Sequence, residues 1–290
     1  MIQDISPRKL INTYHNILPE EGDPVFVFDE EGRVLLGNEG GRIVFTRASE
    51  AKKEETVYLF AIDEKRFFLA LDGYESSAEG RKTPDKDYRI PEKGFEYYTI
   101  REVRDRFTEE SNAELYAVFT AWHLWKWYSD NRFCGKCGRK LTLGTKERSL
   151  ICAGCDNTVY PRINPAVIVG VTKGDCLLLT RYRRGYGHNA LVAGFTEIGE
   201  TLEETVKREV MEETGVDVTN IRYYKSQPWG MAQDILVGFY CDALGDAKIR
   251  MDENELKYAE WVKREDIVLQ PNNLSLTNEM MRVFKEGGRV

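Results

Sequence analysis

Short apolar runs dominate the first quarter of the chain. Between residues 24 and 72, the runs PVFVF, RVLL, VYLFAI and RFFLAL are separated by turn-forming residues. Runs of this length, rich in β-branched and aromatic residues, predict the strands of a small antiparallel sheet. The segment 73–93, rich in Gly, Lys and Asp, then predicts a long surface loop.

A helix is predicted over the tryptophan-rich segment that follows this loop. Ser111 precedes Glu114 by three residues, which is the spacing of a capping box at a helix N-terminus. Leu115, Val118 and Trp122 then recur at helical spacing. We interpret the Trp-rich stripe as packing against a neighbouring domain rather than as a cofactor-binding surface.

Strands and helices alternate from Pro165 onward. PAVIVGV and CLLLTRY predict two strands joined by a Lys-Gly-Asp turn, and IRYYKSQPW, DILVGFYCDA and YAEWV predict further strands. An acidic helix is expected over about 202–214, and a final helix is expected to end near Glu286. The fold class predicted from this pattern is α+β.

Length and composition describe a globular protein of several domains. Hydrophobic residues make up 42% and charged residues 31% of the 290 positions, which excludes a disordered or fibrous chain. The net charge of −7 argues against a general nucleic-acid binder. An anionic substrate would therefore need metal ions or Arg side chains in its site. The expected domains are a strand-rich domain with a closing helix at 1–125, a compact insert at 126–162 and an α+β domain at 163–290.

The location of the protein is predicted from the apolar segments that the sequence lacks. Residues 1–10 contain no apolar run flanked by basic residues, as a secretory signal would. No stretch of about eighteen apolar residues suits a membrane span. We therefore expect a cytoplasmic protein that does not cross a membrane.

Four of the six cysteines form two Cys-x-x-Cys pairs, Cys134 with Cys137 and Cys152 with Cys155, separated by fourteen residues. This spacing suits a tetrahedral Zn²⁺ site. Four thiolates leave no open coordination position, so we expect one structural zinc per chain. A redox-active dithiol would need one pair only and would leave the other unexplained. The scattered basic residues of the insert are interpreted as a solvated face rather than a nucleic-acid surface.

Acidic residues on the predicted helix 202–214 carry the strongest chemical signal in the chain. Glu209 and Glu213 are four positions apart and share a helix face, and Glu212 lies beside them. Like charges at this spacing weaken a helix, so they favour a site for Mg²⁺ or Mn²⁺, which prefer oxygen ligands. Spacing alone also allows an acidic solvated face.

The segment that contains this helix resembles the Nudix box, G-x5-E-x7-R-E-U-x-E-E-x-G-U, where U is an aliphatic residue. The residues at its fixed positions are Gly194, Glu200, Arg208, Glu209, Val210, Glu212, Glu213, Gly215 and Val216. Nudix hydrolases cleave a nucleoside diphosphate linked to another moiety, by attack of water on phosphorus assisted by divalent ions. The resemblance implies an α/β/α sandwich for the domain 163–290 and a Nudix-like fold for the domain 1–125.

The resemblance also implies which residues bind the catalytic metal. The implied ligands are the carbonyl of Ala193 and the carboxylates of Glu209, Glu212, Glu213 and Glu255. Glu212 is either a ligand or the base. Arg208 would orient the carboxylates by pairing with Glu200.

The order of motifs is similar to that of the NADH pyrophosphatase family: a zinc ribbon, Tyr160-Pro161-Arg162, the Nudix box and Ser226-Gln227-Pro228-Trp229. Members of that family are homodimers that hydrolyse the pyrophosphate of NAD(H) to a nicotinamide mononucleotide and AMP. Some members also remove NAD caps from RNA. The resemblance therefore implies a dinucleotide substrate, Mg²⁺ or Mn²⁺ in the catalytic site and a homodimer.

Substrate-binding residues follow from position in the family pattern. They are Tyr160, Phe195, Gln227, Pro228, Trp229, Gly230, Met231, Ala232, Gln233, Asp234 and Thr277. Aromatic side chains suit this role because nucleobase and nicotinamide rings offer a stacking face. Gly230-Met231-Ala232 stands where the family usually has Pro-Phe-Pro, and Thr277 where an Ala is expected. We expect the first departure to free the backbone of this segment and to loosen the preference for NAD(H).

Two other functions remain open from the sequence. A diphosphatase for ADP-ribose or dinucleoside polyphosphates would use the same metal site with a different ring pocket. A non-catalytic nucleotide- or RNA-sensing module would bind without turnover. The complete acidic motif disfavours the second function, because a pure binder does not need every metal-binding acid.

Overall fold

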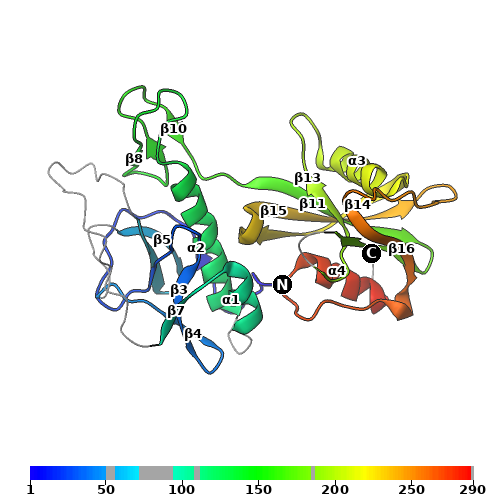
Figure 1. The fold of residues 1–290 in the computed structure, drawn as a ribbon, viewed down its shortest axis with the longest axis horizontal. Helices are drawn as coiled ribbons and strands as arrows, with labels where there is room; N and C mark the ends of the chain where they lie inside the picture. The colour runs from blue at the N-terminus through cyan, green and yellow to red at the C-terminus, as the bar shows by residue number, and fades with distance from the viewer. Residues whose placement is uncertain (50–55, 72–93, 108–111, 184–186, 289–290) are drawn as a thin grey trace. The chain divides into compact units, whose positions relative to one another are not determined.

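The structure of the protein is a computed structural model that describes residues 1–49, 56–71, 94–107, 112–183 and 187–288 (Figure 1). The chain divides into two compact units. The N-terminal unit comprises Asp4–Arg162 and Gly230–Ala232, and the C-terminal unit comprises Met1–Gln3, Ile163–Trp229 and Gln233–Val290. The predicted loop 73–93 and the predicted N-cap Ser111 lie outside the described residues.

Two small sheets form the strand-rich part of the N-terminal unit. One has the order β1-β5-β6-β2, and the other has the order β4-β3-β7. The strands are β1 (Leu10–Ile11), β2 (Val25–Phe26), β3 (Val34–Glu39), β4 (Arg42–Phe45), β5 (Thr56–Ile62), β6 (Lys65–Ala70) and β7 (Phe95–Tyr98). The expectation of one antiparallel sheet is wrong, because β2 pairs with β6 in parallel and the strands separate into two sheets.

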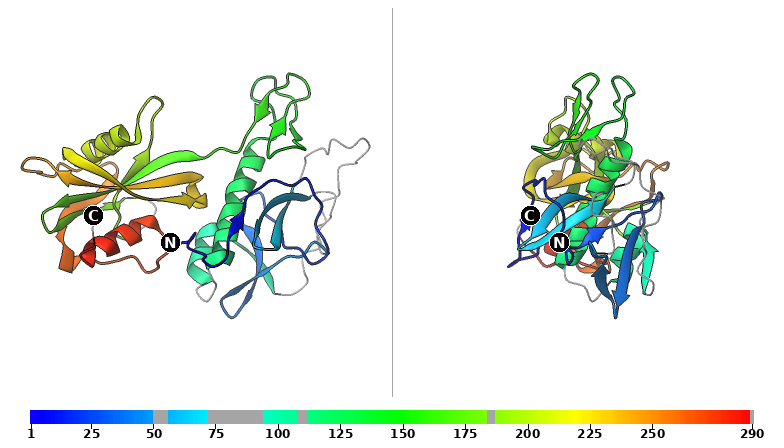
Figure 2. Two further views of the ribbon diagram at one scale, coloured as in Figure 1. Left: turned by 180° about the vertical axis from the view of Figure 1, so that it is seen from behind. Right: turned by 90° about the vertical axis from the view of Figure 1, so that its left-hand side faces the viewer.

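Helices α1 (Ile100–Arg106) and α2 (Asn112–Asp130) follow these strands in the N-terminal unit (Figure 2). Two tryptophans of the Trp-rich stripe of α2 contact residues of this same unit, where packing against a neighbouring domain was expected. The ring of Trp125 stacks on Phe28 with centroids 5.1 Å apart. The indole N–H of Trp122 donates to the Gly32 carbonyl oxygen at 3.1 Å.

The cysteine-containing insert forms a third small sheet in the N-terminal unit. Its strands, in the order β10-β9-β8, are β8 (Thr142–Leu143), β9 (Leu150–Ile151) and β10 (Thr158–Val159). Both pairings are antiparallel. The short hairpins bring the two Cys-x-x-Cys turns together, as described below.

A six-stranded mixed sheet forms the centre of the C-terminal unit. The order is β14-β15-β11-β12-β16, with β13 also paired to β11. The strands are β11 (Asn164–Lys173), β12 (Cys176–Tyr182), β13 (Val192–Phe195), β14 (Val218–Trp229), β15 (Asp234–Ala243) and β16 (Leu256–Lys263). Helices α3 (Leu202–Thr214) and α4 (Leu276–Lys285) cover opposite faces of this sheet (Figure 1). The predicted α/β/α sandwich is confirmed.

Alternate residues of β11 point to the two helices. Val167 and Val169 pack in one apolar cluster with Val206 of α3. Ile168 packs in the other cluster with Met280 of α4. A strand covered on both faces accounts for the nearly continuous apolar run PAVIVGV. Among the described residues, no helix has the length and hydrophobicity needed to cross a bilayer.

Candidate active site

Helix α3 has well-defined ends that hold its acidic residues in place. Thr201 accepts a hydrogen bond on Oγ1 from the Glu204 N–H at 3.2 Å, and Glu204 accepts one from the Thr201 N–H at 2.8 Å. This reciprocal capping box satisfies two backbone donors at the N-terminus. Gly215 ends the helix with φ 67° and ψ 20°, a left-handed conformation that costs glycine little. The predicted helix over 202–214 is confirmed.

Arg208 links the acids of α3 to the preceding loop. Its guanidinium donates to both carboxylate oxygens of Glu200, with Nε–Oε1 at 2.6 Å and Nη2–Oε2 at 2.9 Å. The same side chain donates to Glu209 at 2.8 Å and to Glu212 at 3.1 Å. Hydrogen bonds from Arg208 lower the pKa of Glu200 to about 2. One cation therefore orients three carboxylates.

Gly194 of β13 makes room for the Glu209 carboxylate. A Cβ added at Gly194 would overlap the carboxyl group of Glu209. Glu209 is partly buried, and burial raises its pKa, while the hydrogen bond from Arg208 opposes this shift. Only glycine allows the carboxylate to approach the β13 backbone this closely. The glycine that opens the acidic motif therefore has a steric role.

Glu213 is the most buried acid of the site, with 2% of its surface exposed. Burial raises its pKa to about 8. The Tyr182 hydroxyl and the Ala193 backbone lower the pKa by hydrogen bonding, whereas the nearby charges of Glu209 and Glu255 raise it. Burying a carboxylate away from cations is costly, so this position suits an acid that awaits a positive ion.

Tyr182 is a residue of the site that sequence reasoning missed. Its hydroxyl lies 3.1 Å and 3.3 Å from the two carboxylate oxygens of Glu213, and 3.5 Å from the carbonyl oxygen of Ala193. Tyr182 ends strand β12, and β13 and α3 supply its partners. The sequence shows only an aromatic residue at a strand end, so the contact could not be predicted without the strand order.

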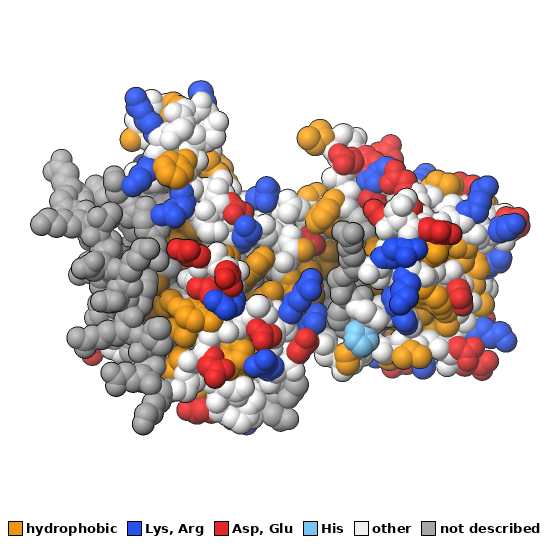
Figure 3. All heavy atoms as spheres, viewed as in Figure 1, with side chains coloured by type: hydrophobic (Ala, Val, Ile, Leu, Met, Phe, Trp, Pro, Cys, Tyr) orange, Lys and Arg blue, Asp and Glu red, His pale blue; other side chains and the backbone are white. Residues whose placement is uncertain are grey.

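Glu212 and Glu255 are more exposed than the other acids. The Glu212 side chain is 60% exposed, and its carboxylate contacts Arg208. Glu255 lies just before β16 and is exposed, yet its charge raises the pKa of both Glu209 and Glu213. Acidic side chains gather over α3 in Figure 3. The donor set of carboxylates and a backbone carbonyl suits a hard divalent ion.

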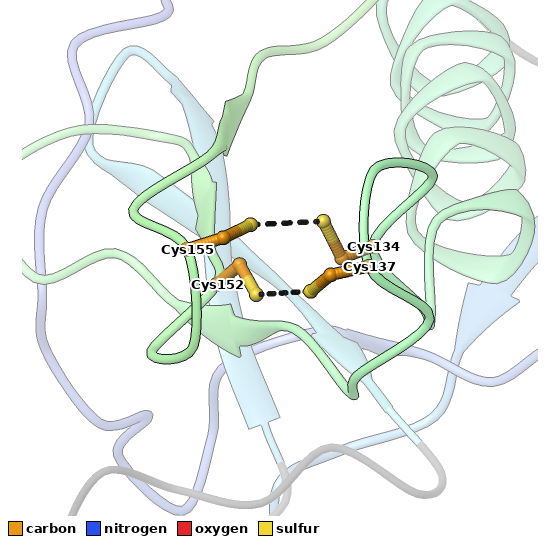
Figure 4. A group of neighbouring side chains, drawn as sticks. All are labelled: Cys134, Cys137, Cys152 and Cys155. Atoms are coloured by element: carbon orange, nitrogen blue, oxygen red, sulfur yellow. Dashed lines mark hydrogen bonds between the residues drawn. The ribbon is translucent and has the colours of Figure 1, made fainter.

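The four cysteines of the insert converge more tightly than these acids. Cys134 and Cys155 have sulfurs 3.7 Å apart, and Cys137 and Cys152 have sulfurs 3.4 Å apart (Figure 4). Sulfurs at the corners of a tetrahedron with zinc–sulfur distances of about 2.3 Å would be about 3.8 Å apart. Among the described residues, only these cysteines form a group of three or more candidate ligands within 4.8 Å of one another. The expected structural zinc site fits this geometry.

Two of the expected ring-binding residues are exposed. Phe195 is 52% exposed and follows Gly194 on β13. Tyr160, which belongs to the N-terminal unit, is 55% exposed, and its hydroxyl donates to Glu147 at 2.8 Å. Each ring therefore has surface available for stacking.

Gln227, by contrast, is fully buried, and other residues already occupy its amide. Its Nε2 donates to Gln3 Oε1 at 2.8 Å and to the Leu274 carbonyl at 2.9 Å. Its Oε1 accepts from the Leu276 N–H at 2.7 Å. Gln227 therefore joins β14 to residues 1–3 and to the start of α4, which sequence reasoning did not foresee.

The segment after Trp229 is shaped by close packing. Gly230–Ala232 form a short 3-10 helix, η2, that belongs to the N-terminal unit. A Cβ at Gly230 would overlap the backbone carbonyl of Phe119. The expectation that Gly230 frees this backbone is therefore wrong, because the glycine permits a close approach to α2. Met231 is partly buried and Ala232 is exposed.

The remaining expected substrate residues lie in the C-terminal unit. Pro228 is exposed, whereas Trp229 and Thr277 are partly buried. Gln233 is buried and has a φ of 61°. Asp234 is 5% exposed, burial raises its pKa to about 7, and within the described part of the chain its Oδ1 has no hydrogen-bond partner.

Comparison with known proteins matches two parts of the chain. Residues 161–284 match the NUDIX domain, and residues 129–160 match the NADH pyrophosphatase zinc ribbon domain. The NAD-capped RNA hydrolase NudC of Klebsiella pneumoniae subsp. pneumoniae is 40% identical over 151 residues, which is 51% of this chain and 58% of that protein. The proteins of the same name from Salmonella typhi and Escherichia coli O1:K1 are 39% and 38% identical, over 51% of this chain and 58% of each protein. The match thus spans little more than half the length of these relatives. The chain contains a Nudix domain that directly follows an NADH pyrophosphatase zinc ribbon domain.

Proposed function

We propose that the protein hydrolyses the pyrophosphate bond of NAD(H) to a nicotinamide mononucleotide and AMP. The observation that carries this proposal is the pairing of a complete acidic Nudix site with a zinc ribbon of the NADH pyrophosphatase type. The relatives named NAD-capped RNA hydrolase support a substrate that contains NAD. NAD-capped RNA is accordingly proposed as a second substrate. A cytoplasmic homodimer is the proposed working state, with 163–290 as its catalytic domain, 126–162 as the ribbon and 1–125 as a Nudix-like domain.

The proposed metal site comprises the residues that surround the buried Glu213. Glu209, Glu213 and the Ala193 carbonyl would hold a divalent ion, Mg²⁺ or Mn²⁺, with Glu212 and Glu255 completing the set. Bound there, the ion would neutralise the bridging phosphates and lower the pKa of a coordinated water. The high pKa of Glu213 in the absence of a cation supports this assignment, since a divalent ion would stabilise the ionised form.

Two other side chains of the site are proposed to orient the metal-binding carboxylates and to activate the attacking water. Arg208 is already bonded to Glu200 and Glu209, so it would hold the carboxylates in position without being a ligand. Glu212 is the proposed base. Its carboxylate is the most exposed of the acids on α3 that Arg208 contacts, so an attacking water could reach it and transfer a proton to it.

Ring recognition is proposed for the aromatic residues Phe195 and Tyr160. Further substrate-binding roles are proposed for Pro228, Trp229, Gln233, Asp234 and Thr277 of the C-terminal unit, and separately for Gly230–Ala232 of the N-terminal unit. Gln227 would act indirectly, because its amide is occupied by the hydrogen bonds that anchor β14.

Product analysis tests the proposed reaction. The protein, purified with its zinc, is incubated with NADH, NAD or ADP-ribose, each with and without Mn²⁺. We expect a nicotinamide mononucleotide and AMP from NAD(H) only when the metal is present. Hydrolysis of ADP-ribose alone would favour the alternative diphosphatase, and binding without turnover of any substrate would favour the sensing module.

Specificity is tested at Met231 rather than by replacing the whole Gly-Met-Ala segment. Proline at Gly230 would collide with the Phe119 carbonyl, so that replacement would disturb the fold of η2. Met231→Phe alone restores an aromatic face. We expect it to raise kcat/KM for NADH relative to ADP-ribose by up to about tenfold, as for other single pocket contacts. An unchanged ratio would place specificity elsewhere.

A further inference from the structure

The hydroxyl of Tyr182 contacts two groups that the proposed function assigns to the catalytic metal. It lies 3.1 Å from Glu213 Oε1 and 3.5 Å from the Ala193 carbonyl oxygen. We propose that Tyr182 is a positioning residue for the catalytic ion, holding the Glu213 carboxylate and the Ala193 carbonyl in place for the metal. The proposal rests on the function proposed above.

The strand that carries Tyr182 is irregular at this point. Arg181 of β12 pairs with Tyr258 of β16, but Tyr182 pairs with Leu256, so Lys257 is an extra residue on β16. Bulges of this kind re-aim side chains and are common next to active sites. The irregularity lies directly beside the residue whose hydroxyl reaches the acids, so local strand geometry supports a specific placement of Tyr182.

An uncharged hydrogen-bond donor such as the Tyr182 hydroxyl positions the Glu213 carboxylate for a metal ion better than a cationic side chain would. Glu209 is held by the charged Arg208, whereas the Glu213 carboxylate accepts hydrogen bonds from the Tyr182 hydroxyl and the Ala193 backbone. Both donors are uncharged, so they leave the negative charge of Glu213 uncompensated. A divalent ion can therefore bind to the carboxylate. Groups that orient metal ligands in this way commonly contribute about 10–100-fold to metal affinity.

Tyr240 provides a matched control in the same unit. It is 1% exposed on β15, and its hydroxyl donates to the Met280 carbonyl at 2.7 Å. It packs in the apolar cluster with Met280 of α4, whereas the acids of α3 lie on the helix that covers the opposite face of the sheet. Tyr240→Phe therefore removes a buried hydroxyl without touching the proposed metal ligands.

The experiment compares wild-type protein with Tyr182→Phe and Tyr240→Phe, each purified with zinc in its ribbon. Mn²⁺ affinity is measured without substrate, by calorimetry or by the paramagnetic resonance of free Mn²⁺. We expect Tyr182→Phe to weaken Mn²⁺ binding by about 10–100-fold. The Mn²⁺ dependence of NADH hydrolysis should shift by the same factor, while KM for NADH at saturating Mn²⁺ stays unchanged. Tyr240→Phe should change neither quantity by more than about twofold.

A second pair of variants separates positioning from a loss of stability. In a Glu213→Gln background the metal-binding carboxylate is gone and the Ala193 carbonyl is the one proposed ligand that Tyr182 still contacts, so Tyr182→Phe should cause a clearly smaller further loss of Mn²⁺ affinity. Wild-type Mn²⁺ affinity in Tyr182→Phe would overturn the proposal, as would equal losses in both Tyr→Phe variants or an undiminished effect in the Glu213→Gln background. If wild-type protein binds Mn²⁺ but leaves NADH intact, the proposed function fails, while the affinity comparison still decides the role of Tyr182.

Discussion

The zinc ribbon and helix α3 both gather metal-binding groups, but they hold them differently. The four ribbon sulfurs lie within 4.8 Å of one another, on two short turns. The carboxylates of α3 are held by two different side chains, with Arg208 bonded to Glu209 and Glu212 and Tyr182 bonded to Glu213. The ribbon geometry is thus already that of a closed site, whereas the acids are spread over α3 and differ in exposure, from the buried Glu213 to the exposed Glu212.

This difference distinguishes a site expected to stabilise the fold from the site proposed to perform the chemistry. A closed thiolate site contributes its binding energy to folding. An open carboxylate site contributes little stability of its own, because buried acids such as Glu213 are costly without a cation. Damage to the ribbon should therefore reduce stability, and damage to α3 should reduce turnover. The predictions below test this distinction.

The largest effect is expected from Glu213→Gln. The substitution keeps the side-chain shape but removes a metal-binding charge, so kcat/KM for NADH should fall by about a thousandfold, corresponding to several kcal/mol of lost transition-state stabilisation. The melting temperature should not fall, because the buried acid is removed. Glu203→Gln, an exposed acid at the start of the same helix, is the control and should keep wild-type turnover. Turnover of Glu213→Gln within tenfold of wild type would contradict the proposed catalytic role of the acids on α3.

Cys152→Ser, in contrast, should reduce the stability of the fold. Cys152 is fully buried in the ribbon, and its loss opens the closed ligand set. We expect zinc content to fall from about one per chain to near zero, together with a loss of several kcal/mol of folding free energy. Metal analysis and thermal unfolding measure both. Cys176→Ser, at a cysteine outside the ribbon, should retain the zinc. Stable Cys152→Ser protein with full zinc content would contradict a structural role for the ion.

A smaller effect is expected from Gly194→Ala. The added methyl displaces the flexible end of Glu209, so the fold should lose less than about 1 kcal/mol, while kcat/KM falls by about 10–100-fold. Gly135→Ala in the ribbon is the matched control, since a Cβ there meets no atom within 4 Å. Zinc content and stability should both survive in that control. Equal activity of Gly194→Ala and wild type would show that Glu209 need not approach β13.

The smallest effect concerns Asp234, a buried acid of the C-terminal unit. Burial raises the pKa of Asp234 to about 7 in the folded protein, above the value of about 3.9 for an unfolded Asp. The folded state then binds more protons, so this residue makes stability fall as pH rises from about 4 to about 7. Asp234→Asn should remove that slope, as measured by urea unfolding between pH 4 and pH 8. If the free energy of unfolding depends on pH in the same way in both proteins, the raised pKa of Asp234 is refuted.

Local features were the most predictable parts of the fold and site. The ends of α3 follow from Thr201, Glu204 and Gly215, and the zinc ligands follow from Cys-x-x-Cys spacing, since all of these act over a few residues. Strand pairing could not be predicted, because the parallel contact of β11 with β15 joins distant segments. Tyr182 was missed for this reason, as its role depends on which strand and helix lie beside it. Gly230 was misjudged because close packing, not flexibility, determines its identity.

The anchoring of Gln227 has a consequence for the order in which the protein assembles. Gln3 and Gln227 are 224 positions apart, and Ile2 donates a backbone hydrogen bond to Leu274. At about 5–20 residues per second, a ribosome needs about 10 to 45 seconds to make the chain between the two glutamines. Cys134 and Cys155 are only 21 positions apart, so the ribbon can bind zinc while the catalytic domain is still being made. Residues 1–3 must remain available throughout that interval, and this part of the core forms only after Gln227 and Leu274 have been made.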